Sequence, residues 1–347
     1  MSDAPAPEMI DWKIAVALGS KIAGEGPPVS RAEADEAVAE LRADANRSTS
    51  LVRDFTGLDA PDGTAPILVV DRAGWVRANA EGFRAATAPL IDKLTEKRPP
   101  SGLSRAIGAK VTGAEVGGLL GYMAGKVLGQ FDPFHPGHGR LLLVAPNVVH
   151  VERELGVDPT DFRLWVCLHE ETHRVQFTAV PWMRDHLFSE IAAITGAMEP
   201  GSLLEGGAER LAEIVRVART GGSIIDMVST PEQREILDRV TGMMSLLEGH
   251  ADVVMDDVGP EVIPSVEAIR AKFTQRRKGL GTLDRILRRL LGLEAKMAQY
   301  RDGAKFVRAV VDKVGMEEFN AVWAEPAHLP SKAELLDAEA WIARVLG

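Results

Sequence analysis

LWVCLHEETHRVQF, residues 164–177, is the stretch on which the interpretation of this chain rests. His169 and His173 stand four residues apart, and Glu170 lies between them. On a helix this spacing places both imidazoles on one face, one turn apart, so that they can converge on a single ion. Glu170 would then stand beside that ion as a general base. The motif therefore predicts a metal site, with zinc as the ion.

The residues around the motif predict that it lies in the middle of a helix. Asp158 can cap the helix and Pro159 suits its first position, while Pro181 forces it to end near residue 178. Phe162 and Trp165 extend the face that carries the histidines, so these continue an apolar stripe. Buried imidazoles need partners, and a zinc ion would satisfy both of them. The alternative is a pair of hydrogen-bonded core histidines beside an ordinary exposed glutamate.

A catalytic zinc site uses three protein ligands and leaves one position for water. The segment LLEGHADVVMDD, residues 246–257, offers the third ligand, because Glu248 and Asp252 interrupt an otherwise apolar helical face. Unpaired buried carboxylates are costly, so we expect Glu248 to bind the metal. Asp252 could accept a hydrogen bond from the outer nitrogen of a ligating histidine. Glu205, in the similar segment LLEGGAE, is the alternative third ligand, and His250 is a further candidate.

Together these residues predict a hydrolase. The pKa of a zinc-bound water falls toward about 7, and Glu170 can take its proton and pass it to a leaving amine. Peptide or small amide substrates suit this chemistry, and a small non-peptide substrate is the alternative. The developing oxyanion needs a further donor. The polar candidates for this role are His250, His186, Tyr300 and Arg301.

Composition excludes several classes of protein. The 347 residues carry a formal net charge of -10, whereas a nucleic-acid binder needs a surplus of Lys and Arg. The single Cys167 excludes an internal disulfide framework and a cysteine-based zinc finger. The beginning of the chain lacks a basic segment followed by an apolar run, so we expect a cytoplasmic protein.

The remaining pattern predicts a mainly α protein, of the α+β kind with a small sheet. Strands are expected at 66–71 and 140–145, the second being either an edge strand that aligns a peptide or a plain structural strand, and 130–140 is expected to be a loop. Glycine at every fourth position from 113 to 129 predicts a closely packed helix. It is not expected to span a membrane, because Glu115 and Lys126 shorten the apolar run.

We expect residues 1–347 to form a single unit with two lobes. The N-terminal lobe, 1–178, would end with the helix that carries the two histidines. The helical C-terminal lobe, 179–347, would supply the third ligand.

HEETH at 169–173 with EGHAD at 248–252 resembles the HExxH plus ExxxD arrangement of the gluzincin metallopeptidases. More specifically, the chain looks like a bacterial family of zincin-like hydrolases, some of whose members are associated with biosynthesis of a deazaflavin cofactor. The resemblance is sharpest over residues 157–182 and 245–256. It implies a zincin-like fold, zinc on His169, His173 and Glu248, catalysis by Glu170, and support from Asp252.

A second class of function stays open beside the hydrolase. In this class zinc only stabilises a helical scaffold, and the basic segment at 270–289 or the glycine-spaced helix binds a protein partner. An exchangeable water on the zinc would indicate catalysis. A fourth protein ligand, such as His250 or Glu205, would indicate a closed structural site.

Overall fold

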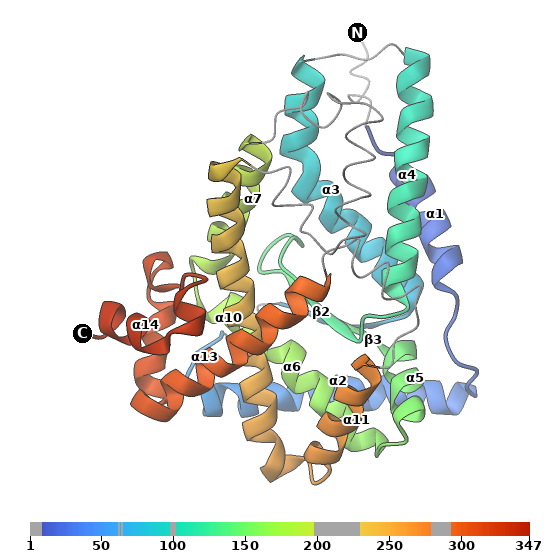
Figure 1. Ribbon diagram of the computed structural model, residues 1–347. Coiled ribbons are helices and arrows are strands. Elements are labelled where there is room, and N and C mark those ends of the chain that lie inside the picture. The colour runs from blue at the N-terminus through green and yellow to red at the C-terminus, as the bar shows by residue number, and fades with distance from the viewer. Residues whose placement is uncertain (1–8, 62, 64, 98–101, 198–229, 279–292) are drawn as a thin grey trace. The chain divides into compact units, whose positions relative to one another are not determined.

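The computed structural model describes residues 9–61, 63, 65–97, 102–197, 230–278 and 293–347 (Figure 1). As the sequence predicts, the described chain is mainly helical with a small sheet. Its internal contacts define an N-terminal unit, residues 1–46 and 63–170, and a C-terminal unit, residues 47–62 and 171–347. The division into lobes at residue 178 stays a prediction. None of the described helices combines the length and the apolar character that crossing a bilayer requires.

The N-terminal unit contains one sheet and most of the helices that precede the HExxH motif. Its helices are α1 (Trp12–Ala23), α3 (Arg72–Lys97), α4 (Gly102–Ala124), α5 (Ala145–Leu155) and the larger parts of α2 (Arg31–Thr56) and α6 (Pro159–Ala179). Its strands are β1 (Ile67–Val70), β2 (Gly129–Asp132) and β3 (Arg140–Val144).

The sheet has the strand order β1-β3-β2. β1 runs parallel to β3, with Leu68 beside Leu142, and β2 runs antiparallel to β3, with Gln130 on the other side of Leu142. Every residue of β3 is buried, as expected for an apolar strand that has neighbours on both edges. β3 is therefore the central strand, and the possibility that residues 140–145 form an edge strand is wrong.

The segment expected to be a loop at 130–140 is in part a strand. Residues 129–132 pair with β3, and only the residues after them form the connecting turn. Asp132 is buried, and it accepts hydrogen bonds from Arg140 Nε and from the backbone N–H of Phe134, each at 3.0 Å. The short strand is stabilised by these contacts as well as by its pairing with β3. Its composition of Gly, Gln, Phe and Asp gives a weak strand signal.

Close packing of α4 against α1 explains the spaced glycines (Figure 1). A Cβ atom at Gly113 would lie 2.4 Å from the backbone oxygen of Asp11, just before α1. At Gly117 and Gly121 it would lie 2.6 and 2.7 Å from backbone oxygens within α1. Only glycine permits such an approach, so the predicted close packing is confirmed. The helix ends before the last two glycines of the series.

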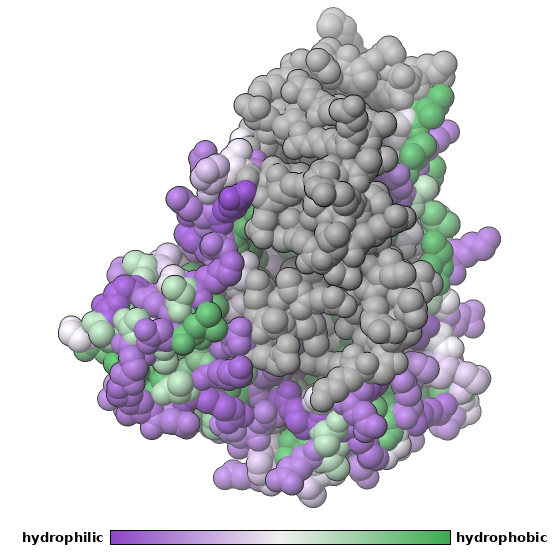
Figure 2. Space-filling model, viewed as in Figure 1, coloured by the Kyte–Doolittle hydropathy of each residue, from purple (hydrophilic) through white to green (hydrophobic). Residues whose placement is uncertain are grey.

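The opposite side of α4 is apolar and exposed. Ile107, Val111 and Leu119 are exposed by 58%, 54% and 40%. Figure 2 shows hydrophobic residues along the exposed side of α4, at the right of the view. These side chains share one helical face, so α4 is apolar on more than the side that packs against α1.

The C-terminal unit is built from helices that surround an aromatic core. Its helices are α7 (Met183–Ala197), α10 (Pro231–Val262), α11 (Val266–Lys278), α13 (Leu293–Phe319) and α14 (Ala338–Val345), with short 3-10 turns at Asn320–Trp323, Pro326–His328 and Glu334–Leu336. α10 and α13 approach so closely that a Cβ atom at Gly249 would lie 2.2 Å from the carbonyl carbon of Gly303. This contact fixes the part of α10 that carries Glu248.

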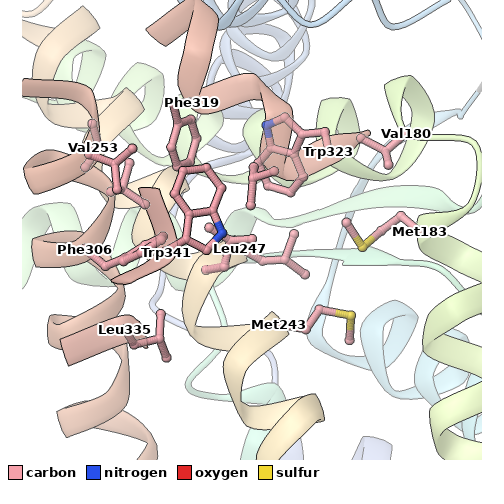
Figure 3. Packing of buried hydrophobic residues seen from close by; sticks show 14 of the residues in the cluster. Val180, Met183, Met243, Leu247, Val253, Phe306, Phe319, Trp323, Leu335 and Trp341 are labelled. Atoms are coloured by element: carbon pink, nitrogen blue, oxygen red, sulfur yellow. The ribbon is translucent and has the colours of Figure 1, made fainter. Parts of the chain in front are cut away.

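The core of the C-terminal unit gathers residues from α7, α10, α13 and the C-terminal turns (Figure 3). Phe306, Phe319 and Trp341 are almost completely buried, and Phe306 meets the ring of Trp341 edge-on at 5.7 Å. Leu247 of α10 lies in the same cluster. The core therefore holds α10 on one of its faces, and Glu248 is the next residue along the chain.

Candidate metal centre

The helix that carries the two histidines forms as the sequence predicts. α6 begins at Pro159, and the Asp158 side chain accepts a hydrogen bond from the backbone N–H of Asp161 at 3.1 Å. It ends at Ala179, two residues before Pro181. Its buried positions include the stacked rings of Phe162 and Trp165. The apolar face thus anchors the helix, and the motif lies in its second half.

Three side chains come together at this part of α6. The ligand atoms of His169, His173 and Glu248 all lie within 4.8 Å of one another, and His173 Nε2 is 3.8 Å from Glu248 Oε1. Ligands bound at about 2.1 Å to a tetrahedral ion lie about 3.4 Å apart. Of these three, the His173 imidazole and the Glu248 carboxylate would need to approach each other by only a few tenths of an ångström.

The donors fit a zinc ion in their chemistry as well as their spacing. Two imidazole nitrogens and one carboxylate oxygen form a set used by catalytic zinc sites. The side chains of His173 and Glu248 are 13% and 25% exposed, so solvent reaches the grouping. Among the described residues this grouping contains three donors, which leaves a tetrahedral ion one further position.

Glu170 is buried against strand β2 rather than exposed. A Cβ atom at Gly129 would lie 2.5 Å from Glu170 Cγ and 3.0 Å from its Oε1. The side chain of Glu170 therefore occupies the space that any other residue at position 129 would fill. The alternative that Glu170 is an ordinary exposed glutamate is wrong, because its exposure is 7%.

Gln176 is a buried residue that the sequence reasoning missed. His173 Nδ1 lies 3.0 Å from Gln176 Oε1, on the side of the ring away from Glu248. Gln176 Nε2 donates to the backbone oxygen of Leu247 and also lies 3.0 Å from His250 Nδ1. The available signal was the spacing of three between His173 and Gln176, which places both side chains on neighbouring turns.

His250 lies in the core and not on an accessible surface. It is fully buried, and its ring lies 5.7 Å from the ring of Phe319 and 5.3 Å from that of Trp323. Burial, with a smaller contribution from the nearby His173, lowers the pKa of His250 to about 3. Its role as an oxyanion donor or metal ligand stays a prediction.

A buried ion pair lies one residue after Glu170. Glu171 is fully buried and accepts hydrogen bonds from Arg174 Nε at 2.8 and 2.9 Å and from the Thr49 hydroxyl at 2.8 Å. The pair connects α6 to the end of α2. It supports the motif structurally. The sequence reasoning missed this pair, although opposite charges three residues apart on a helix indicate a possible ion pair.

Asp252 makes an ion pair with an arginine. Its carboxylate lies 3.3 Å from Arg270 Nη1, and the same arginine binds Asp256. Burial raises the pKa of Asp256, while the charges of Arg270 and Arg308 act in the opposite direction. The Nδ1 partner of His173 is Gln176 and not Asp252. Support of a ligating histidine by Asp252 stays a prediction.

The remaining predicted site residues are, in the described parts of the chain, not part of the grouping of His169, His173 and Glu248. His186 lies on α7, half-buried, with its ring edge-on to Trp182 at 5.8 Å. Tyr300 and Arg301 lie on α13, but their side chains are outside the described part of the structure. Glu205 falls outside the described residues altogether.

Comparisons with known proteins place the chain in a family and beside a solved structure. The model of a family described as "Zincin-like metallopeptidase" matches residues 10–342. A crystal structure from Chloroflexus aurantiacus, described as "a putative hydrolase with a novel fold", is 32% identical in sequence, with a TM-score of 0.72. The alignment covers 96% of this chain and 98% of that one. No curated protein matches the chain.

Proposed function

The chain belongs to the zincin-like metallopeptidase family, and we propose that it is a zinc-dependent hydrolase that cleaves peptide or other amide bonds. The observation that carries the proposal is the convergence of His169, His173 and Glu248 within 4.8 Å. Glu170, between the two histidines, is the proposed general base. The hydrolase described from Chloroflexus aurantiacus supports the reaction class.

Each residue has a separate role in this proposal. A bound zinc ion supplies Lewis acidity, which acidifies water and polarises a carbonyl. His169, His173 and Glu248 would hold the ion. Glu170 accepts the proton of the attacking water, keeps it during the addition step, and delivers it to the leaving amine. The contact with Gly129 confines the Glu170 side chain, so that less orientational freedom has to be lost in the reaction.

The partial exposure of the ligands favours a catalytic site over a closed structural one. A structural zinc is surrounded by four protein ligands, whereas three are grouped among the described residues. Solvent contact at His173 and Glu248 gives a water and a substrate carbonyl a way in. We expect an amide substrate because an amide nitrogen must gain a proton to leave as an amine. Glu170 can deliver that proton.

The substitution Glu170→Gln tests the proposal. Zinc-loaded wild-type protein should cleave members of a fluorogenic peptide library, and Glu170→Gln should bind zinc equally but cleave at least about a hundredfold more slowly. Exposed Glu317→Gln is the matched control and should behave as wild type. Equal rates for Glu170→Gln and wild type would exclude the mechanism. A zinc-saturated wild type that cleaves nothing in the library would favour the scaffold instead.

A further inference from the structure

A short chain of hydrogen bonds lies behind His173, on the side away from Glu248. It runs from His173 Nδ1 to Gln176 Oε1, and from Gln176 Nε2 to Leu247 O and His250 Nδ1, each at 3.0 Å. Gln176 and His250 are both fully buried. Water therefore has little access to replace any member of this chain.

The partners of Gln176 determine the direction of every proton in the chain. The backbone oxygen of Leu247 can only accept, so the amide nitrogen of Gln176 must face it. The amide oxygen then faces His173, whose Nδ1 must carry the proton. Consequently Nε2 of His173, the nitrogen that faces Glu248, keeps its lone pair for a metal ion.

His250 removes the remaining freedom of the amide group. Its Nδ1 faces the same nitrogen of Gln176, so it accepts and the proton of its own ring lies on Nε2. That Nε2 is buried and has no hydrogen-bond partner among the described residues. The ring is held between Phe319 and Trp323, which makes rotation to another arrangement difficult. An amide flipped by 180° would place its oxygen against the backbone oxygen of Leu247, which can only accept.

We propose that Gln176 is a positioning residue for the metal centre, locked by Leu247 and His250, and that it fixes His173 in the tautomer that binds zinc through Nε2. This inference rests on the proposed metal site. It assigns to a neutral amide the role that carboxylates commonly have behind metal-bound histidines. A neutral partner adds no negative charge behind the ring, so it orients His173 with less gain in ligand basicity than a carboxylate would give.

The zinc affinity of the full-length protein tests this role. Gln176→Leu keeps the volume and suits the buried position, but it removes the acceptor for His173. We expect it to bind zinc about 10- to 100-fold more weakly in competition with a chromophoric chelator. Gln176→Glu keeps an oxygen facing His173 Nδ1 and, when protonated, can still donate to Leu247 O, so it should bind zinc more tightly than Gln176→Leu. Thr178→Val, which removes a hydrogen bond to Arg174 O on the same helix, is the control and should not change affinity.

A spectroscopic measurement gives a second readout that does not depend on the variants. In metal-free wild-type protein labelled with 15N-histidine, long-range 1H–15N spectra should show His173 protonated at Nδ1 and His250 protonated at Nε2. A His173 proton on Nε2 would overturn the inference, as would equal zinc affinity of Gln176→Leu and wild type. A wild type that binds no zinc would overturn the metal centre itself, and the positioning role with it.

Discussion

Among single residues, the buried His250 makes the folded protein sensitive to acid. Burial lowers the pKa of His250 to about 3 in the folded state, whereas the ring of an unfolded chain titrates near 6.5. Between these values the unfolded state binds a proton that the folded state does not. The contribution of neutral His250 to the free energy of unfolding is therefore fully present above about pH 6.5 and is lost as the pH decreases toward 3.

We predict that the free energy of unfolding decreases by about 2 kcal/mol between about pH 7.5 and pH 5 because His250 becomes protonated in the unfolded chain only. The measurement is urea unfolding at both pH values in the presence of a chelator, so that loss of metal does not contribute. His250→Phe keeps an aromatic ring between Phe319 and Trp323, and should lose this part of the pH dependence. The half-exposed His150→Gln should keep it. Equal pH dependence of wild type and His250→Phe would show that His250 titrates normally.

The three residues that the structure groups could be singled out from the sequence, but their supporting contacts could not. His169 and His173 were found because four residues is one helical turn, and Glu248 because it interrupts an apolar face. Gln176 has no comparable signal. A glutamine three residues after a histidine is common, and only the packing of α10 against α6 shows that its amide has three partners. Asp252 is a different case, because the sequence singled it out but did not indicate its partner. Its carboxylate pairs with Arg270, and the separation of the two residues along the chain gives no sign of this contact.

At the scale of elements, strand β2 and helix α6 meet at Glu170. The absence of a side chain at Gly129 is what lets the Glu170 carboxylate lie against the strand. Gly129→Ala would place a methyl group 2.5 Å from Glu170 Cγ, closer than such atoms approach in real structures. Glu170 must then move, although the histidines and Glu248 are unchanged.

We therefore predict that Gly129→Ala reduces peptide cleavage at least about tenfold while zinc affinity stays as in wild type, because misplacing a catalytic group by about 1 Å can cost up to a hundredfold. Both quantities can be measured with the assays used for Glu170→Gln. Gly118→Ala is the control, since a Cβ atom there meets nothing within 4 Å. Undiminished cleavage by Gly129→Ala would mean that Glu170 needs no defined position.

The helices and strands differed in how well the sequence predicted them. α6 was predicted to within a residue or two at both ends, because a capping aspartate and two prolines bound it. β3 was found as an apolar run, but its central position depends on β2. That strand is four residues long and contains a glycine and two polar residues, so its pairing with β3 defines it more than its own composition does. Pairing between strands is a non-local property, and a scan for local patterns misses it.

For the molecule as a whole, the proposed metal centre would join segments that are far apart in the chain. His173 and Glu248 are on α6 and α10, and the residues between them include 198–229, which lie outside the described part of the structure. A ligand that binds only the folded state stabilises it in proportion to the logarithm of its concentration over its dissociation constant. At a thousandfold excess this contribution is about 4 kcal/mol. Zinc should therefore stabilise the whole fold and not only the motif.

We predict that removing zinc with a chelator lowers the unfolding temperature by several degrees and that adding zinc back restores it. The same measurement decides between the two candidate third ligands. If Glu248 binds the metal, Glu248→Gln should lose most of the zinc-dependent stabilisation, because a neutral amide is a much weaker ligand than a carboxylate. Glu205→Gln should keep all of it. The reverse result, with Glu205→Gln insensitive to zinc and Glu248→Gln stabilised normally, would move the third ligand to the other segment. Loss of the response in both variants would require both carboxylates to hold the ion, which describes a closed site with four protein ligands and no place for a catalytic water.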